Sequence, residues 1–236
     1  MNNTSANLQK SIGFLNSKIE KAANKTNRTY KDITLIAVTK SHPPPIWDFA
    51  LKNNLSILAE STIQEAQNKL ISCSKRKNLE LHMIGHLQTN KVKKAIEMFD
   101  IIQSVDSFKL ANRINTISKE KNKKTQIFLQ VNTSNDPLKY GFSKENIIPS
   151  IHQISNLEHI SVIGIMTIPK HNLPKQKLRR VYKQTYEIQK TIYDKHITSC
   201  KNLSMGMSND FEIAIEEGAT HIRIGTTLFG KRTVWS

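Results

Sequence analysis

The 236-residue sequence contains little cysteine, few aromatic residues and no long hydrophobic run. Its two cysteines, Cys73 and Cys200, form no Cys-x-x-Cys pair and no Cys/His cluster. This usage argues against a disulfide scaffold or a zinc site and favours a reducing cytosol. No stretch approaches the ~18–20 apolar residues that a membrane span needs, and the N-terminus lacks the apolar core of a signal peptide. We therefore expect a cytoplasmic protein that contacts no membrane.

Acidic residues are also scarce. The chain has 35 Lys and Arg against 19 Asp and Glu, a formal net charge of +16 at pH 7. Such a charge can attract nucleic acid or anionic ligands. However, the basic residues are scattered along predicted helices and are not interleaved with aromatic residues, as a nucleic-acid platform requires. A general drift of the composition toward Lys, Asn and Ile, which raises the charge without any partner, is the favoured explanation. We expect no specific nucleic acid, and a basic nucleic-acid-binding module stays open as an alternative.

Short apolar runs alternate with longer amphipathic segments along the chain. Eight strands are predicted, at residues 33–39, 56–59, 81–84, 100–104, 126–132, 161–167, 202–205 and 221–224. Helices are predicted at 6–23, 46–53, 62–72, 92–99, 108–119, 144–156, 174–196 and 209–217. Strict alternation of strands and helices implies a parallel sheet. Eight such units in ~250 residues match the size of a (β/α)8 barrel.

The predicted fold class is therefore α/β, a single (β/α)8 TIM barrel with an extra N-terminal helix. We expect one domain over residues 1–236, with the N-terminal helix within 1–24 and the barrel over 33–231. No convincing helix follows the last strand, and the N-terminal helix could cover that gap. An open doubly wound sheet is the second possibility, but no GxGxxG follows the first strand and no Walker motif occurs.

Lys40 ends the first predicted strand, and the Ser-His-Pro-Pro-Pro that follows continues neither a strand nor a helix. Active sites of such barrels lie at the C-terminal ends of the strands. A lysine in those partly desolvated surroundings has a lowered pKa, which favours the neutral amine. A neutral lysine amine attacks an aldehyde to form a Schiff base. The alternative is a lysine whose amine extends into solvent at the strand end.

The C-terminal segment adds a candidate phosphate site. Ser208 is predicted as the N-cap of the last helix, which Gly218 closes, and backbone N–H groups at a helix N-terminus hold anions. Gly225 and Thr226 follow the last strand and offer unobstructed backbone amides and a hydroxyl. Loops after the seventh and eighth strands are where this barrel class binds phosphate.

Arg223 lies inside the apolar run HIRIG, so we expect its side chain to be buried. A buried guanidinium without a partner is costly. It therefore either forms an ion pair with a barrel carboxylate such as Glu60 or donates to an uncharged acceptor on a ligand. A lysine for an aldehyde, a phosphate cradle and a planar donor together fit pyridoxal 5′-phosphate (PLP).

The sequence resembles the pyridoxal phosphate homeostasis proteins, single-domain relatives of the N-terminal barrel of alanine racemase. The resemblance runs from about residue 33 to residue 231. The motifs that carry it are LIAVTK, AESTIQEAQNK, LHMIGHLQTNK, QVNTSNDPLKYGF, GIMTIP, LSMGMS and HIRIGTTLFG. Their spaced succession is more specific than any one of them.

The resemblance implies a role for each candidate residue. Lys40 would carry PLP as a covalent Schiff base, Ser208, Gly225 and Thr226 would hold the phosphate, and Arg223 would face the pyridine nitrogen. The family usually reads Gly-Glu-Asn-Tyr where this chain has Ala-Glu-Ser-Thr at 59–62. Ser61 therefore stands where an asparagine normally lies near the cofactor, and it is shorter and lacks the amide donor.

These roles imply a carrier of PLP and not an enzyme with rapid turnover. A cation at the pyridine nitrogen disfavours its protonation, so the ring is a poor electron sink. Racemisation also needs a second acid/base, which racemases take from a C-terminal domain, and no replacement is visible before Ser236. We expect a monomer that takes part in intracellular PLP homeostasis, holds this vitamin B6 cofactor reversibly and supplies it to apo-enzymes. A PLP-dependent amino-acid racemase stays open.

Overall fold

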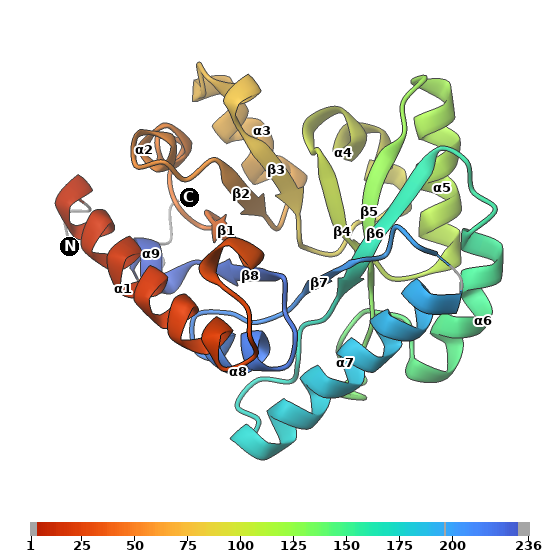
Figure 1. Ribbon diagram of the computed structural model, residues 1–236. Coiled ribbons are helices and arrows are strands. Elements are labelled where there is room, and N and C mark those ends of the chain that lie inside the picture. Colours follow the sequence, from red (N-terminus) through yellow and green to blue (C-terminus); the bar gives the residue numbers. More distant parts are fainter. Residues whose placement is uncertain (1–3, 196, 231–236) are drawn as a thin grey trace.

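A closed barrel of eight parallel strands forms the centre of the computed structural model, which describes residues 4–195 and 197–230 (Figure 1). The strands pair in chain order, and β1 also pairs with β8. They are β1 (Thr34–Val38), β2 (Ile57–Glu60), β3 (Glu80–Met83), β4 (Ile101–Val105), β5 (Thr125–Gln130), β6 (Ile160–Met166), β7 (Asn202–Ser204) and β8 (His221–Ile224). The predicted (β/α)8 fold is confirmed, and the predicted strand bounds differ only slightly from those observed.

Helices alternate with the strands and surround them (Figure 1). They are α1 (Ser5–Asn24), α2 (Ile46–Lys52), α3 (Ile63–Ser72), α4 (Val92–Met98), α5 (Phe108–Glu120), α6 (Lys144–Ile154), α7 (Lys175–Lys195), α8 (Phe211–Glu216) and α9 (Thr226–Phe229). Short 3-10 turns occur at η1 (Tyr30–Asp32), η2 (Arg76–Asn78) and η3 (Thr89–Lys91). Side-chain caps start several helices, since a Ser or Thr oxygen accepts a backbone N–H of the first turn at Thr4, Thr62, Ser107 and Ser143.

The N-terminal helix covers the side of the barrel where the last strand has only a short helix after it. A single turn, α9, follows β8, although the sequence predicted no convincing helix there. The apolar face of α1 buries Leu8, Leu15 and Ile19, and the helix packs against α8 and α9 (Figure 1). The predicted role of this helix is confirmed, because apolar surface at β8 needs a cover that α9 is too short to provide.

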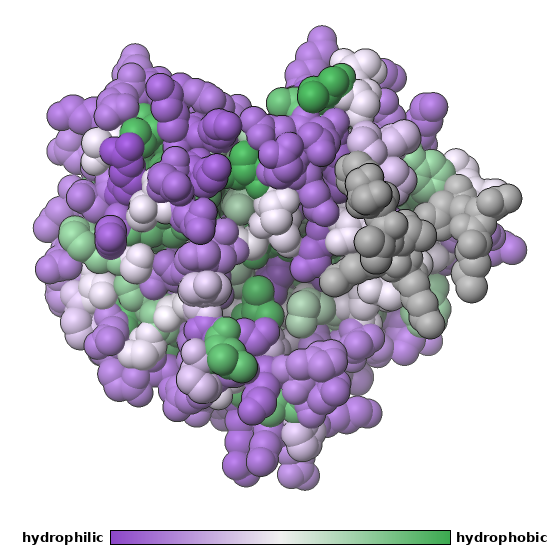
Figure 2. All heavy atoms as spheres, turned by 180° about the vertical axis from the view of Figure 1, so that it is seen from behind, coloured by the Kyte–Doolittle hydropathy of each residue, from purple (hydrophilic) through white to green (hydrophobic). Residues whose placement is uncertain are grey.

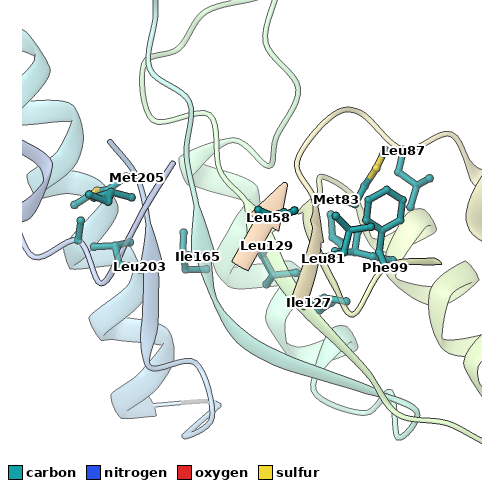
Figure 3. Packing of buried hydrophobic residues seen from close by; sticks show 14 of the residues in the cluster. Leu58, Leu81, Met83, Leu87, Phe99, Ile127, Leu129, Ile165, Leu203 and Met205 are labelled. Atoms are coloured by element: carbon teal, nitrogen blue, oxygen red, sulfur yellow. The ribbon is translucent and has the colours of Figure 1, made fainter. Parts of the chain in front are cut away.

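Strand residues alternate between two hydrophobic layers. Outward residues pack against the helices and form the main core, in which Leu81 and Met83 of β3 lie close to Phe99 (Figure 3). Inward residues fill the barrel in two smaller clusters, one of Ile36, Val38, Ala59 and Ile84, the other of Ile101, Phe128 and Met166. Successive side chains of a strand point to opposite faces, so alternate residues along each strand belong to alternate layers.

The start of the last long loop corrects one prediction. Helix α8 begins at Phe211 with Asp210 as its N-cap, so Ser208 lies in the preceding turn and is not the cap. The Asp210 carboxylate accepts the backbone N–H of Met207 at 2.6 Å and thereby closes that turn before the helix begins. Gly218 follows the helix with φ +100°, as predicted for a glycine that closes a helix.

Some predicted bounds fall on His196 and Lys231, which lie outside the described residues. Within the residues that are described, none of the helices combines the length and apolarity that crossing a membrane would require. The face of the molecule in Figure 2 is largely hydrophilic, with hydrophobic residues gathered only in small groups.

Candidate functional site

A cavity of about 590 Å³ opens at the C-terminal ends of the strands. Five of the six residues that the sequence proposed as a site line it: Lys40, Ser208, Arg223, Gly225 and Thr226. They come from the segment after β1, the β7–α8 loop and the end of β8, which are far apart in the sequence. Barrel closure brings them together because β8 pairs directly with β1.

A buried polar cluster holds Thr39, the residue that precedes Lys40 just after the end of β1. The preceding residue, Thr39, points outward and donates its hydroxyl to Glu60 Oε1 at 2.5 Å. Lys69 on α3 donates to the same Glu60 oxygen at 2.7 Å and to the Thr39 carbonyl at 2.8 Å. Trp47 on α2 also donates to Glu60 Oε1, at 3.1 Å. Thr39 is thereby held on the outer side of the barrel, and Lys40, in the turn that follows β1, lines the cavity.

Arg223 is buried, as predicted, but it does not pair with Glu60. Its Nη1 donates to Ser204 Oγ at 2.6 Å and its Nη2 to the Thr167 carbonyl at 2.8 Å. Arg223 points into the barrel and Glu60 outward, so the ion pair considered from the sequence cannot form. Within residues 4–195 and 197–230, no carboxylate forms a salt bridge with this guanidinium. Burial lowers the pKa of Arg223 to about 10, against the raising effect of Tyr182 and Asp210, so the group remains a cation at neutral pH.

The candidate phosphate-binding groups lie side by side at the cavity wall. Ser208 Oγ accepts the backbone N–H of Thr227 at 3.4 Å, which ties the β7–α8 loop to the first turn of α9. Gly225 is the N-cap of α9, and Thr226 is its first residue. A Cβ atom at Gly225 would lie 3.2 Å from the Val38 carbonyl, so only glycine lets β8 approach β1 this closely without displacement. The result is a short turn in which Ser208, Gly225 and Thr226 line one cavity wall.

Ser61 is not among the described residues that line the cavity, and its contact with a cofactor stays a prediction. It follows β2, and its backbone packs against Gly85, where an added Cβ would meet the Ser61 carbonyl. This contact explains the glycine after β3.

The loop between β6 and α7 is the part of the cavity wall that the sequence reasoning missed. Its residues Ile168, Lys170 and His171 line the cavity together with Lys139 from the β5–α6 loop. Both loops follow the C-terminal ends of strands, which is the signal that could have found them. The lysines give the cavity mouth a positive potential that suits an anionic ligand. Within the described residues, no group of His, Cys, Asp and Glu side chains could hold a metal ion.

Comparisons with known proteins agree on one family. The family model of the alanine racemase N-terminal domain matches residues 16–233. A pyridoxal phosphate homeostasis protein of Aquifex aeolicus is 34% identical over 215 residues, 91% of this chain and 94% of that protein. The structure of PipY from Synechococcus elongatus with PLP bound is 31% identical with a TM-score of 0.80, over 90% of this chain and 100% of that one.

The fold is also shared with a more distant enzyme. Alanine racemase of Clostridium difficile has a TM-score of 0.72 at 18% identity, and the match covers 96% of this chain but 60% of the enzyme. That likeness shows a common barrel. The family match over most of the chain and the closer relatives show more: the chain belongs to the pyridoxal phosphate homeostasis proteins, a family built on the alanine racemase N-terminal domain.

Proposed function

We propose that this protein binds PLP covalently and reversibly on Lys40, keeps the free aldehyde at a low concentration and supplies the cofactor to apo-enzymes. The observation that carries the proposal is the convergence of Lys40, Ser208, Arg223, Gly225 and Thr226 on one cavity. The names of the relatives and the PLP in the PipY structure support the same ligand.

The donor set of the cavity fits the chemistry of PLP. The phosphate needs N–H and hydroxyl donors, which Gly225, Thr226 and Ser208 offer at one wall. The pyridine nitrogen needs a single donor, and Arg223 is a buried cation that Ser204 and Thr167 hold without neutralising it. The aldehyde needs a primary amine, which Lys40 provides.

Lys40 would hold the ligand by a condensation that is easily reversed. Its amine would condense with an aldehyde carbon and release one water molecule, and addition of water would restore the free lysine. When bound, PLP supplies an electrophilic carbon and a ring that can accept electrons. Ser208 and the α9 amides would retain the phosphate while the covalent bond opens and closes.

Arg223 would make this site a poor catalyst. A guanidinium at the pyridine nitrogen disfavours a second positive charge within hydrogen-bond distance. Arg223 would thereby disfavour protonation of the ring nitrogen, so a bound ring would withdraw little charge from a carbanion. We therefore expect little or no turnover, which distinguishes this protein from a PLP-dependent racemase.

The test is covalent trapping on the purified protein with added PLP. Borohydride reduces the C=N bond to a stable amine, so mass spectrometry should find the adduct on the peptide that contains Lys40. Lys40→Ala should lose both the adduct and the visible absorption. Lys52→Ala, which removes an exposed lysine of α2, should keep both. A wild-type protein that stays colourless and unlabelled would refute the proposal.

The racemase alternative makes a different prediction. It requires a D-amino acid to accumulate at an enzyme-like rate when L-amino acid and PLP are supplied, and to stop accumulating in Lys40→Ala.

Several finer points also stay part of the proposal: one domain over residues 1–236, a monomer and a cytoplasmic location. The free thiols of Cys73 and Cys200 support the last point, because disulfides are rare in the cytosol.

A further inference from the structure

A chain of hydrogen bonds crosses the inside of the barrel from Arg223 to its opposite end. Arg223 Nη1 donates to Ser204 Oγ at 2.6 Å, and Ser204 donates to Gln103 Oε1 at 2.7 Å. Gln103 Nε2 lies 2.6 Å from His82 Nδ1, and His82 Nε2 lies 2.8 Å from Glu80 Oε1. The residues come from β8, β7, β4 and β3. Only the last of them, Glu80, has an exposed side chain.

Glu80 and Arg223, the two ends of this hydrogen-bond chain, determine which group is the donor and which the acceptor in every hydrogen bond between them. An ionised Glu80 carboxylate only accepts, so His82 Nε2 carries the proton and His82 Nδ1 accepts from the Gln103 amide. The amide oxygen of Gln103 is then turned toward Ser204, whose hydroxyl proton it accepts. The remaining lone pair of Ser204 faces Arg223, which only donates. Each group thus has one role, and the cation lies at one end and the anion at the other.

The chain of hydrogen-bonded side chains is not needed to fill the interior of the barrel. Elsewhere the same interior is packed with apolar side chains, such as Ile36, Val38 and Phe128. Buried polar groups destabilise a fold unless every one of them is paired, and apolar replacements of similar volume are often neutral or stabilising. A fully paired polar line through an interior filled largely by apolar side chains therefore points to a role at the end where Arg223 meets the cavity.

We propose that Ser204, Gln103 and His82 are positioning residues for Arg223. They fix the plane of its guanidinium, and with it the donor that faces the pyridine nitrogen of bound PLP. The chain is not a path for protons, because the Gln103 amide does not readily take up and release them. Its effect is one of orientation and of an electric field directed along the bonds. This inference rests on the proposed function, in which Arg223 contacts the ring.

The experiment uses the whole polypeptide with added PLP and compares two disruptive variants with one conservative variant and one matched control. Gln103→Leu keeps the volume and removes two bonds of the chain, and Ser204→Ala removes the bond to Arg223 itself. Ser204→Thr keeps the hydroxyl. Ser104→Ala serves as the matched control, since Ser104 is the buried neighbour of Gln103 on β4 and its hydroxyl has no hydrogen-bond partner among the described residues.

The readouts are the absorption spectrum of bound PLP, its affinity and the Tm of the protein without PLP. Ser204→Ala and Gln103→Leu should shift the absorption maximum and weaken PLP binding roughly tenfold, the weight of one hydrogen bond to a charged group. Ser204→Thr and Ser104→Ala should match the wild type in both. A merely structural role would lower the Tm and leave the spectrum of the bound fraction unchanged.

Two outcomes would overturn the inference, and they differ. If wild-type protein binds PLP and the Ser204→Ala and Gln103→Leu variants share its spectrum and affinity, the positioning role is wrong and the proposed function stands. If wild-type protein itself binds no PLP, both fail together. Should Gln103→Leu not fold, Ser204→Ala decides alone, because it removes only one oxygen atom.

Discussion

Lys69 and Glu60 form a salt bridge that is completely buried behind the end of β1, with 2.7 Å between Nζ and Oε1 and no exposure of either side chain. Burial raises the pKa of the Glu60 carboxyl, and the Lys69 ammonium opposes this. The second oxygen, Oε2, has no hydrogen-bond partner among the described residues. The pair therefore holds Thr39 and, through it, Lys40. Desolvation of the two charges is unfavourable and is compensated only while they are paired, so loss of Lys69 would leave the buried Glu60 carboxylate uncompensated.

We expect Lys69→Met to destabilise the protein by about 3–5 kcal/mol, because it leaves a buried carboxylate without its partner. Urea unfolding measures this change. The control is Lys18→Met, which breaks the half-exposed Lys18–Glu212 pair and should change stability by at most about 1 kcal/mol. Equal effects of the two substitutions would show that the buried pair has no special weight.

The pH dependence of stability should report on His221. Burial lowers the pKa of His221 to about 4, helped by His82 and Arg223 and opposed by Glu80. An unfolded histidine titrates near 6.5, so between these values the unfolded chain binds the extra proton. Stability is therefore expected to fall as the pH drops from 6.5 to 4, by roughly 3 kcal/mol from this residue.

Chemical unfolding of the protein without PLP at several pH values measures the slope. His221→Asn keeps a polar atom near Thr220 Oγ1, which His221 Nδ1 contacts at 2.8 Å, and removes the titrating ring. The slope between pH 4 and 6.5 should flatten in this variant. His152→Asn, which changes an exposed histidine, should keep the wild-type slope. An unchanged slope in His221→Asn would contradict the assignment.

Two glycines should respond to alanine in opposite directions. A Cβ at Gly164 on β6 would collide with the Asn202 carbonyl and lie 2.6 Å from Phe128 Cε1, so Gly164→Ala should destabilise the barrel by about 1–3 kcal/mol. Gly13 lies exposed within α1 with open space around it. Gly13→Ala should stabilise by about 0.5–1 kcal/mol through helix propensity. Thermal unfolding distinguishes the two signs.

The phosphate role of Ser208 can be separated from binding in general. We expect Ser208→Ala to weaken PLP binding roughly ten- to a hundredfold, since it removes a donor to a charged oxygen. Pyridoxal, which lacks the phosphate, should bind the variant and the wild type equally. Fluorescence titration with both ligands gives the comparison. If both ligands lost affinity to the same extent, Ser208 would act on the fold of the loop and not on the phosphate.

Local pattern was enough to predict the barrel and to place most of the candidate residues at one cavity. Apolar runs and amphipathic segments alternate so regularly that the eight strands follow from the sequence, and in a barrel the end of each strand faces the active-site side. That rule placed Lys40 and the segment from Ser208 to Thr226 at this side of the barrel, and their expected roles came from the family resemblance. The start of helix α8 could not be predicted in this way. The Asp210 side chain accepts a hydrogen bond from Met207 N and closes a turn, so the helix begins at Phe211 and Ser208 is not its N-cap.

Pairings across the barrel were decided only by the tertiary structure. Whether Arg223 and Glu60 meet depends on which face of the barrel sheet each side chain occupies. Arg223 faces inward and Glu60 outward, so the carboxylate pairs with Lys69 on α3 and not with Arg223. The line from Arg223 to Glu80 joins strands β8, β7, β4 and β3, which come together only when the sheet closes. The sequence gives only the order of the residues, whereas side-chain hydrogen bonds form only when two polar atoms lie about 3 Å apart. Residues far apart in the sequence reach that distance only after folding.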